Sequence, residues 1–324
     1  MKVSKAGIVV LAVGVLLLIM APVWKWGIGP TFIKLLDDIN ITSVYDGGLT
    51  LYVDPQSLQL LPEDMPVKIP LTITRKDTSV PEKSTGKVAV IKEEARAVGP
   101  GGKSFIDYSE YYAMDRKTAQ NVAGNNSDMD RKGWRLMLPM GTEKKGYPMW
   151  DNDTRKSDES EFVRTEKIST PKNKDVEVYV FEAGGTDVCM EPPLGLPEKI
   201  SGAQAKALAG NPGLPIADDQ MVPITYEKTT EATFTVEPRT GTIVDLDNFE
   251  EFSVDATAVG MGKIKLATLK YKQTRESVGE VMDNISQYFG LLTLNSTWLP
   301  LIFLLAGLVL AVIGIILTPR RKTA

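Results

Sequence analysis

The chain has 324 residues, of which 24% are charged and 43% hydrophobic, and a formal net charge of −4. This composition is too apolar for a disordered protein, and its acidic balance argues against a nucleic-acid partner. The absence of histidine and the presence of one cysteine, Cys189, exclude a Ser-His-Asp triad, a histidine-ligated metal, an intrachain disulfide and a thiolate zinc site.

The first predicted element is an uncharged apolar stretch of 19 residues, Ala6 to Trp24, preceded by Lys2 and Lys5. At about 1.5 Å per residue it spans roughly 28 Å as a helix, which is close to the hydrocarbon thickness of about 30 Å. A cleaved signal peptide is the alternative, but the apolar part is long for one and no A-x-A pattern occurs near Ala21. We therefore predict an uncleaved transmembrane helix over residues 6–24.

Residues 25–297 are predicted to form a β-rich domain. Alternation of apolar and polar residues indicates strands, and Asp46-Gly47-Gly48 is typical of a hairpin turn inside residues 43–53. Residues 108–120 fit either a short helix or a strand pair. The other predicted strands cover residues 67–74, 87–91, 177–182, 230–236 paired with 242–246, and 252–259 paired with 263–271.

Two segments of this domain have a different character. Residues 190–223 are rich in proline and glycine around a short helix with Ser201 as its N-cap, and they fit either a binding loop or a passive linker. Residues 277–288 have helical spacing, with Val278, Val281 and Met282 on one side. We expect this second segment to lead the chain back to the membrane.

The last predicted element is a second uncharged apolar stretch of 21 residues, Trp298 to Thr318, followed by the basic run 320–322. Because Lys and Arg flank both outer ends, the positive-inside rule places residues 1–5 and 319–324 in the cytoplasm. Trp24 and Trp298 then lie at the opposite interface, where indole rings are favoured. Residues 25–297 are therefore predicted to be extracytoplasmic.

Small residues recur in both apolar stretches and predict close packing of the two helices as an antiparallel hairpin. The alternative is that glycine is simply common in membrane helices. The predicted packing residues are Gly7, Gly14, Ala21, Gly307, Ala311 and Gly314.

Five glycosylation sequons fall between the two apolar stretches. Asn295 is too close to the predicted membrane to be a good acceptor, and Asn284 is another of the five sequons. The candidate acceptors are Asn40, Asn125 and Asn152.

No motif predicts catalysis, a cofactor or a metal. Ser84 and Lys87 have the S-x-x-K spacing of penicillin-recognising enzymes, but K-T-G is absent. Residues 151–154 resemble the start of a calcium loop, yet Lys156 occupies the position that requires glycine. The chain has neither a Rossmann fingerprint nor a Walker A loop.

Two blocks, Tyr147-Pro148-Met149-Trp150-Asp151 and Val236-Glu237-Pro238-Arg239-Thr240-Gly241, carry a family resemblance. With residues 161–168, 178–181, 234–235 and 242–245 and the two end helices, they resemble the PorA-type porin family, formerly a family of unknown function among bacterial cell-envelope proteins. The resemblance implies channel formation for some members and no catalytic residue. Met149 departs from the aromatic residue expected before Trp150. Structural roles are expected for Tyr147, Pro148, Trp150, Asp151, Val236, Glu237, Pro238, Thr240 and Gly241.

The predicted fold class is a membrane-anchored α+β protein, with two terminal transmembrane helices bracketing a β-rich extracytoplasmic domain. This layout is also similar to that of class B scavenger receptors, although no motif supports that comparison. We predict a non-enzymatic binding or structural module at the cell surface, with the lipid bilayer and an envelope lipid, glycan or protein as partners. The alternatives are a porin-like channel, which short and charged strands disfavour, and an enzyme that uses carboxylates, Ser or Lys. Oligomer formation is left open.

Overall fold

The computed structural model describes residues 5–29, 38–54, 57–62, 65–255 and 262–318. The chain divides into two compact units. A helical unit contains residues 1–34 and 285–324, and a sheet unit contains residues 35–284.

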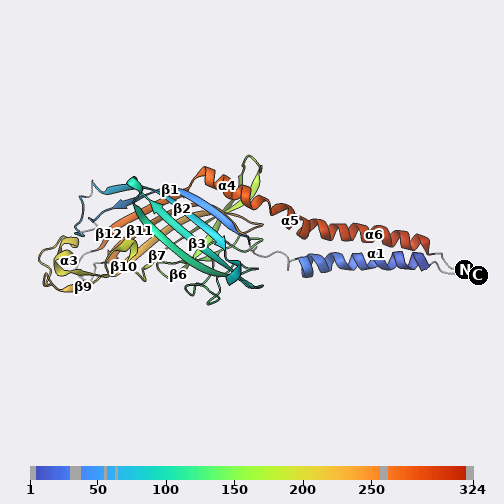
Figure 1. Cartoon of the computed structure of the whole chain (residues 1–324), viewed down its shortest axis with the longest axis horizontal. Helices are drawn as coiled ribbons and strands as arrows, with labels where there is room; N and C mark the ends of the chain where they lie inside the picture. The colour runs from blue at the N-terminus through green and yellow to red at the C-terminus, as the bar shows by residue number, and fades with distance from the viewer. Residues whose placement is uncertain (1–4, 30–37, 55–56, 63–64, 256–261, 319–324) are drawn as a thin grey trace, which may run out of the picture. The chain divides into compact units, whose positions relative to one another are not determined.

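The helical unit consists of two long apolar helices that lie side by side (Figure 1). The first comprises α1 (Lys5–Val23) and the π-helical turn η1 (Trp24–Ile28), and the second comprises α5 (Phe289–Thr293), the π-helical turn η6 (Leu294–Trp298) and α6 (Leu299–Leu317). Both are long and apolar enough to cross a membrane, and only 17% of each apolar window is buried. The helices extend beyond the predicted limits, because residues 25–28 and 289–297 are helical and not part of the β-rich domain.

The two helices pack antiparallel through backbone contacts. Gly14 lies so close to α6 that a Cβ atom on it would be 2.4 Å from the Ala311 nitrogen, and a Cβ atom on Gly314 would be 2.5 Å from the Leu11 nitrogen. Gly7, Ala21 and Gly307 are also buried. Small or missing side chains at these positions allow the helices to approach closely, and such packing is a principal source of attraction between apolar helices in lipid.

We expect Gly14→Leu to separate α1 from α6 by roughly 2 Å or more, because helix pairs with large side chains at their contact approach only to about 10 Å instead of about 8 Å. Electron-spin distance measurements between labels at the exposed positions Leu16 and Val309, in a Cys189→Ala background, would detect the change. Val13→Leu, at an exposed position next to Gly14, is the control. An unchanged distance in Gly14→Leu would contradict the packing.

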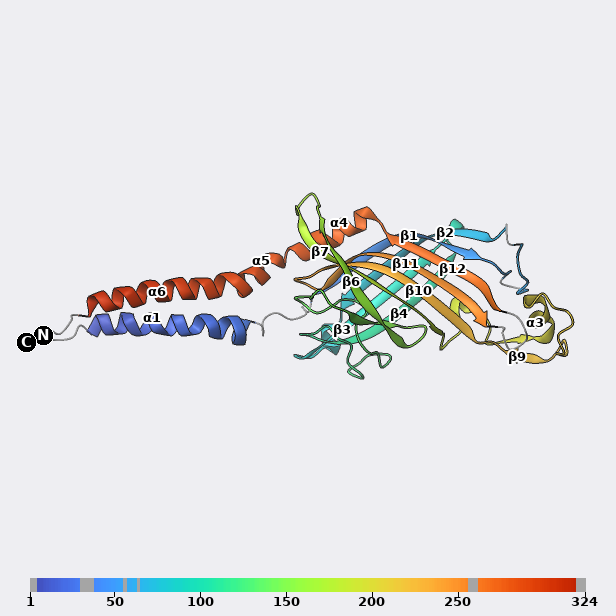
Figure 2. The same ribbon diagram turned by 180° about the vertical axis from the view of Figure 1, so that it is seen from behind.

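The sheet unit is built on ten antiparallel strands in the order β4-β3-β2-β1-β12-β11-β10-β7-β6-β5. Figures 1 and 2 show the sheet curled, with its two halves on opposite sides of a shared interior. The strands are β1 (Asn40–Leu51), β2 (Val67–Ser79), β3 (Val88–Val98), β4 (Ser104–Asp115), β5 (Tyr147–Asp151), β6 (Lys156–Ile168), β7 (Val176–Val188), β10 (Tyr226–Glu237), β11 (Thr242–Asp255) and β12 (Lys263–Gln273).

The loop between β4 and β5, residues 116–146, links the two edges of the sheet. Asn121 forms a bridge with Met114 of β4, and its N–H donates to the Gly133 carbonyl. Trp134 then forms a parallel bridge with Met149 of β5. Backbone hydrogen bonds therefore continue across the gap between β4 and β5, and the sheet closes on itself at this point.

The two faces of the sheet differ in polarity. Concave positions form apolar clusters, such as the one containing Tyr45, Leu49 and Leu269. Convex positions of the same strands are polar and exposed, as Lys270 and Lys272 of β12 illustrate. This alternation is typical of an antiparallel sheet with one solvated face, and strands with such charged outer faces are poorly suited to contact lipid.

Three strand predictions were wrong. Asp46-Gly47-Gly48 is not a turn, because β1 continues through it and pairs with β2 and β12 on both sides. Gly47 allows a close approach instead, since a Cβ atom there would lie 2.5 Å from the Lys270 carbonyl oxygen. The short predicted strands are also wrong: nine strands contain 11–14 residues, so strand length does not argue against a channel. Residues 104–115 form one strand, β4, rather than a helix or a strand pair within 108–120.

The β10–β11 hairpin and the β11–β12 pairing are confirmed, while residues 256–261 of the second connection lie outside the described residues. The Pro/Gly-rich insert contains η4 (Pro193–Gly195), β8 (Lys199–Ser201), α3 (Gly202–Leu208) and β9 (Met221–Pro223). Ser201 and Gln204 form a capping box at the start of α3. The other elements are η2 (Pro81–Lys83), η3 (Pro100–Gly102) and the predicted amphipathic helix, α4 (Arg275–Ser286).

Candidate functional site

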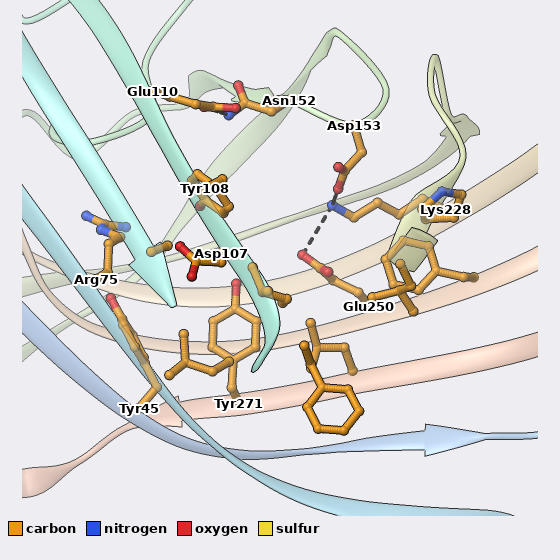
Figure 3. Close-up of a pocket in the computed structure, with 18 of the residues that line it drawn as sticks. Tyr45, Arg75, Asp107, Tyr108, Glu110, Asn152, Asp153, Lys228, Glu250 and Tyr271 are labelled. Atoms are coloured by element: carbon orange, nitrogen blue, oxygen red, sulfur yellow. Dashed lines mark hydrogen bonds and ion pairs between the residues drawn. The ribbon is translucent and has the colours of Figure 1, made fainter. Parts of the chain in front are cut away.

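The concave side of the sheet holds a cavity of about 480 Å³ (Figure 3). Its volume lies within the range of about 300–1,000 Å³ that is usual for small-molecule sites. The walls come from seven strands, from η4, from the turn between β5 and β6 and from the loop between β4 and β5. Residues far apart in the sequence thus meet here because the sheet curls.

One part of the cavity wall is apolar. Phe105, Leu194 and Leu246 pack against the buried cluster that contains Phe252 and Leu269, and all five line the cavity. Leu194 belongs to η4, and the other four residues come from three strands: Phe105 from β4, Leu246 and Phe252 from β11, and Leu269 from β12. This part of the wall can cover an apolar portion of a ligand.

A buried lysine dominates the polar part. Lys228 of β10 is 3% exposed, and its Nζ atom lies 2.8 Å from Asp151, 2.5 Å from Asp153 and 3.2 Å from Glu250. Burial alone would lower the pKa of Lys228, but Glu250, Asp153 and Asp151 hold it well above its usual value. Lys228 is therefore a permanent cation shared by three carboxylates, and Figure 3 shows two of them, Asp153 and Glu250.

A second ion-pair cluster joins β2, β3 and β4. Arg75 binds Asp77 at 2.8 Å, and the Tyr108 hydroxyl donates to Glu93 at 2.6 Å. Glu93 is fully buried, its nearest cation is Arg75 at 3.9 Å, and its Oε2 atom has no hydrogen-bond partner among the residues that the structure describes. Burial raises the pKa of Asp77 to about 6 even though Arg75 opposes this shift.

The raised pKa of Asp77 predicts that its contribution to the free energy of unfolding depends on pH. The carboxyl group has a pKa near 3.8 in the unfolded chain and about 6 in the folded protein. The stability that the protonated carboxyl group contributes is therefore fully present below about pH 4 and is lost as the pH rises through 6. We expect the stability of the wild type relative to Asp77→Asn to fall by on the order of 2 kcal/mol between pH 4 and pH 7. Urea unfolding of both proteins measures this difference. A difference that is constant with pH would contradict the assignment, and Asp107→Asn, at an exposed residue, is the control.

Arg135 differs from the other buried cations. Its Nη1 atom donates to the Trp150 carbonyl at 3.3 Å, and its Nε atom is buried without a partner within the described ranges. Arg135 lines the cavity, so its guanidinium adds positive charge to the wall.

A third ion-pair network lies behind the cavity wall and is centred on Arg131, whose side chain is completely buried. Its guanidinium binds Glu110 at 3.0 Å and Asp128 at 2.7 Å and lies 3.8 Å from the centre of the Tyr112 ring. Asn152 completes the network, accepting from Arg131 and donating to Glu110 and Tyr112. This network holds the loop after β4 and the β5–β6 turn against Glu110 and Tyr112 of β4.

The cavity opens where its lining residues are exposed. The side chains of Asp107 and Asp153 are 70% and 48% exposed, and Gly195 of η4 is exposed as well. The mouth is therefore bounded by β4, the β5–β6 turn and η4. Leu194 occupies the mouth in a left-handed conformation with φ +54°, which is strained for a residue with a side chain.

The predicted glycosylation residues have different surroundings. Asn40 and Asn125 are exposed. The amide nitrogen of Asn152 donates hydrogen bonds to both Glu110 and Tyr112, so a glycan there would displace both. Asn40 and Asn125 remain predicted acceptors.

The family-motif residues lie in β5, at the end of β10 and in the β10–β11 turn, and not among the residues that line the cavity. Tyr147 is buried against Phe181, and Asp151 binds Lys228. Glu237, also buried, accepts from the Thr240 backbone and from Arg239 at the β10–β11 turn. The remaining predicted residues, Pro148, Trp150, Val236, Pro238 and Gly241, lie in or beside these strands and this turn.

The cavity charges Arg75, Arg135, Lys228 and Glu250 were not identified from the sequence. One signal was present for Lys228: it falls in phase with the inward residues Tyr226 and Phe234 of the same strand. Arg75 likewise follows Leu71 and Ile73 at alternate positions. A charged residue at the same alternate positions as the buried apolar residues of a strand indicates a polar interior. Arg135 lies in a loop, where no such alternation exists.

These features define a chain in which a curled antiparallel sheet with an internal cavity is combined with a pair of apolar helices. Residues 6–316 match the family described as porin PorA, so the chain belongs to that family and the predicted resemblance is confirmed. No curated protein matches the chain. Among solved structures it has 9% identity to RV0216, a conserved hypothetical protein from Mycobacterium tuberculosis with a double hotdog fold, over 71% of this chain and 74% of that chain. The TM-score of 0.14 is too low to support any argument.

Proposed function

We propose that the protein is a non-enzymatic, membrane-anchored binding protein of the cell envelope, and that its cavity holds a small ligand with an apolar body and a polar head. The observation that carries this proposal is the cavity itself, with an apolar wall next to Lys228, Arg135 and Glu250. Two helices that expose apolar side chains along their length support the membrane anchoring.

Filling the cavity tests the proposal. Ala95 is an inward residue of β3, is 5% exposed and lines the cavity, so Ala95→Trp would occupy ligand space. We expect the full chain, purified from its membrane, to carry a bound molecule that native mass spectrometry detects, and Ala95→Trp to carry at least about tenfold less, which corresponds to a loss of about 1.4 kcal/mol. Glu94→Trp, at the adjacent outward position, is the control.

Two results would contradict the binding function. One is a wild-type protein without any bound molecule, and the other is equal occupancy in Ala95→Trp and the wild type. Circular dichroism of both variants establishes whether the sheet has formed.

Channel formation is the second candidate, and membership of a family described as porins favours it. The charged convex faces of the strands are unsuited to lipid, so conduction would require an aqueous path other than a lipid-embedded barrel wall. Planar-bilayer recordings on the purified full chain test this candidate. Absence of current over a range of protein concentrations would remove it.

A further inference from the structure

We infer that the ligand of the cavity carries a positive charge, such as an amine or ammonium group, next to its apolar body. This inference rests on the proposed binding function and specifies the chemistry of the same site. It follows from the balance of charges around the cavity.

Carboxylates outnumber cations on the cavity wall. Four acids and three cations line it directly. The groups that pair with these residues, or with Arg131 behind the wall, add four acids and two cations, so eight carboxylates stand against five cations among the described residues. The acids are Asp77, Glu93, Asp107, Glu110, Asp128, Asp151, Asp153 and Glu250, and the cations are Arg75, Arg96, Arg131, Arg135 and Lys228.

Two buried carboxylate oxygens beside the cavity lack a hydrogen-bond partner among the described residues, as does the Arg135 Nε atom. Glu93 is fully buried on the concave face beside Arg75, and neither its Oε2 atom nor the Oδ1 atom of Asp77 has a hydrogen-bond partner in the described part of the chain. Buried charges interact more strongly than exposed ones because water screens them less. A cation brought into the cavity would thus be stabilised by several acids together.

Two of these acids have raised pKa values, which agrees with this balance, whereas the pKa of Asp151 is lowered despite its burial because Lys228 is adjacent. Burial raises the pKa of Asp77 and of Glu250, although Arg75 and Lys228 act in the opposite direction. A bound cation would supply the missing positive charge, whereas a bound anion would add to the excess.

The positions of the acids suggest a route for the charged group. Asp107 and Asp153 are exposed, whereas Glu250 is only 13% exposed and lies beside Lys228. Figure 3 shows the position of Glu250 next to Lys228. The ring of Tyr271 also lines the cavity and can receive a cation on its face. A cationic group would therefore meet acids at the entrance and in the interior, while its apolar body contacts the wall around Phe252.

Three probes with the same apolar chain and different heads test the inference: octylammonium, octanol and octanoate. Calorimetric titrations use the full chain in lipid nanodiscs, with titrations of empty nanodiscs subtracted. We expect octylammonium to bind at least about tenfold more tightly than octanoate, a difference of about 1.4 kcal/mol. Glu250→Gln and Asp153→Asn should each reduce this ratio severalfold. Glu251→Gln, whose side chain pairs with Lys265 on the convex face of β11, should leave it unchanged.

The outcomes separate this inference from the proposed function. Octanoate binding as tightly as octylammonium, or a preference for octylammonium that survives both cavity variants, would overturn the inference and leave the binding function intact. Failure of all three probes to bind would contradict the binding function itself. Because Asp153 is half exposed, its variant keeps the test valid if Glu250→Gln does not fold.

Discussion

Replacing Lys228 with methionine is expected to destabilise the sheet unit by about 3–5 kcal/mol, because it leaves buried carboxylates without their cation. Asp151 and Glu250 would lose contacts of 2.8 and 3.2 Å, and Asp153 would lose its contact as well. Their pKa values would then rise in the folded state, so the loss should be largest at neutral pH and should shrink as the pH falls toward 4.

Urea unfolding of Lys228→Met at pH 7.5 and pH 4.5 measures both the loss and its pH dependence. Lys270→Met, at an exposed position on β12, is the control and should change stability by no more than about 0.5 kcal/mol. A loss in Lys228→Met that does not vary with pH would point to packing of the lysine stem rather than to its charge.

The second large effect is expected for Gly241→Ala at the β10–β11 turn. Gly241 has φ +74°, and a Cβ atom there would lie 2.1 Å from the Leu138 carbonyl oxygen. Its own carbonyl accepts a hydrogen bond from the Leu138 N–H, so the turn and the loop cannot separate without losing this bond. We expect a loss of about 3 kcal/mol or more, made up of backbone strain and the steric overlap.

Gly101→Ala separates these two contributions. Gly101 has nearly the same φ, +71°, but nothing lies within 4 Å of the position of a Cβ atom. It should therefore cost only about 1 kcal/mol, the conformational part alone. Equal losses in the two variants, measured by urea unfolding, would show that the overlap at Gly241 is relieved by movement of the Leu138 loop.

The parts of the structure that depend on local sequence could be predicted. Long uncharged stretches identify both apolar helices, and alternation followed by Glu237-Pro238-Arg239-Thr240-Gly241 identifies the β10–β11 hairpin. The helix ends were missed because Trp24–Ile28 and Leu294–Trp298 form π-helical turns among polar and aromatic residues. Hydropathy alone does not distinguish such turns from the start of a loop.

The parts that depend on the curl of the sheet could not be predicted. Asp46-Gly47-Gly48 has the composition of a turn, but pairing with β2 and β12 on both sides keeps it extended. The cavity collects Arg75, Lys228 and Glu250 from three strands whose order in the sheet no local pattern specifies. Arg135 comes from a loop that is placed only by its contacts with the sheet edges.

The sheet is least stable where β4 and β5 are joined through residues 116–146. Most neighbouring strands share ladders of seven or more paired residues, whereas β4 and β5 are joined through a few backbone bonds at Asn121, Gly133 and Trp134. Amide hydrogens along this seam should exchange with deuterium earlier than those of the central strands. A molecule too large for the mouth of the cavity could then enter where β4 separates from β5, while the regular strand pairings stay intact.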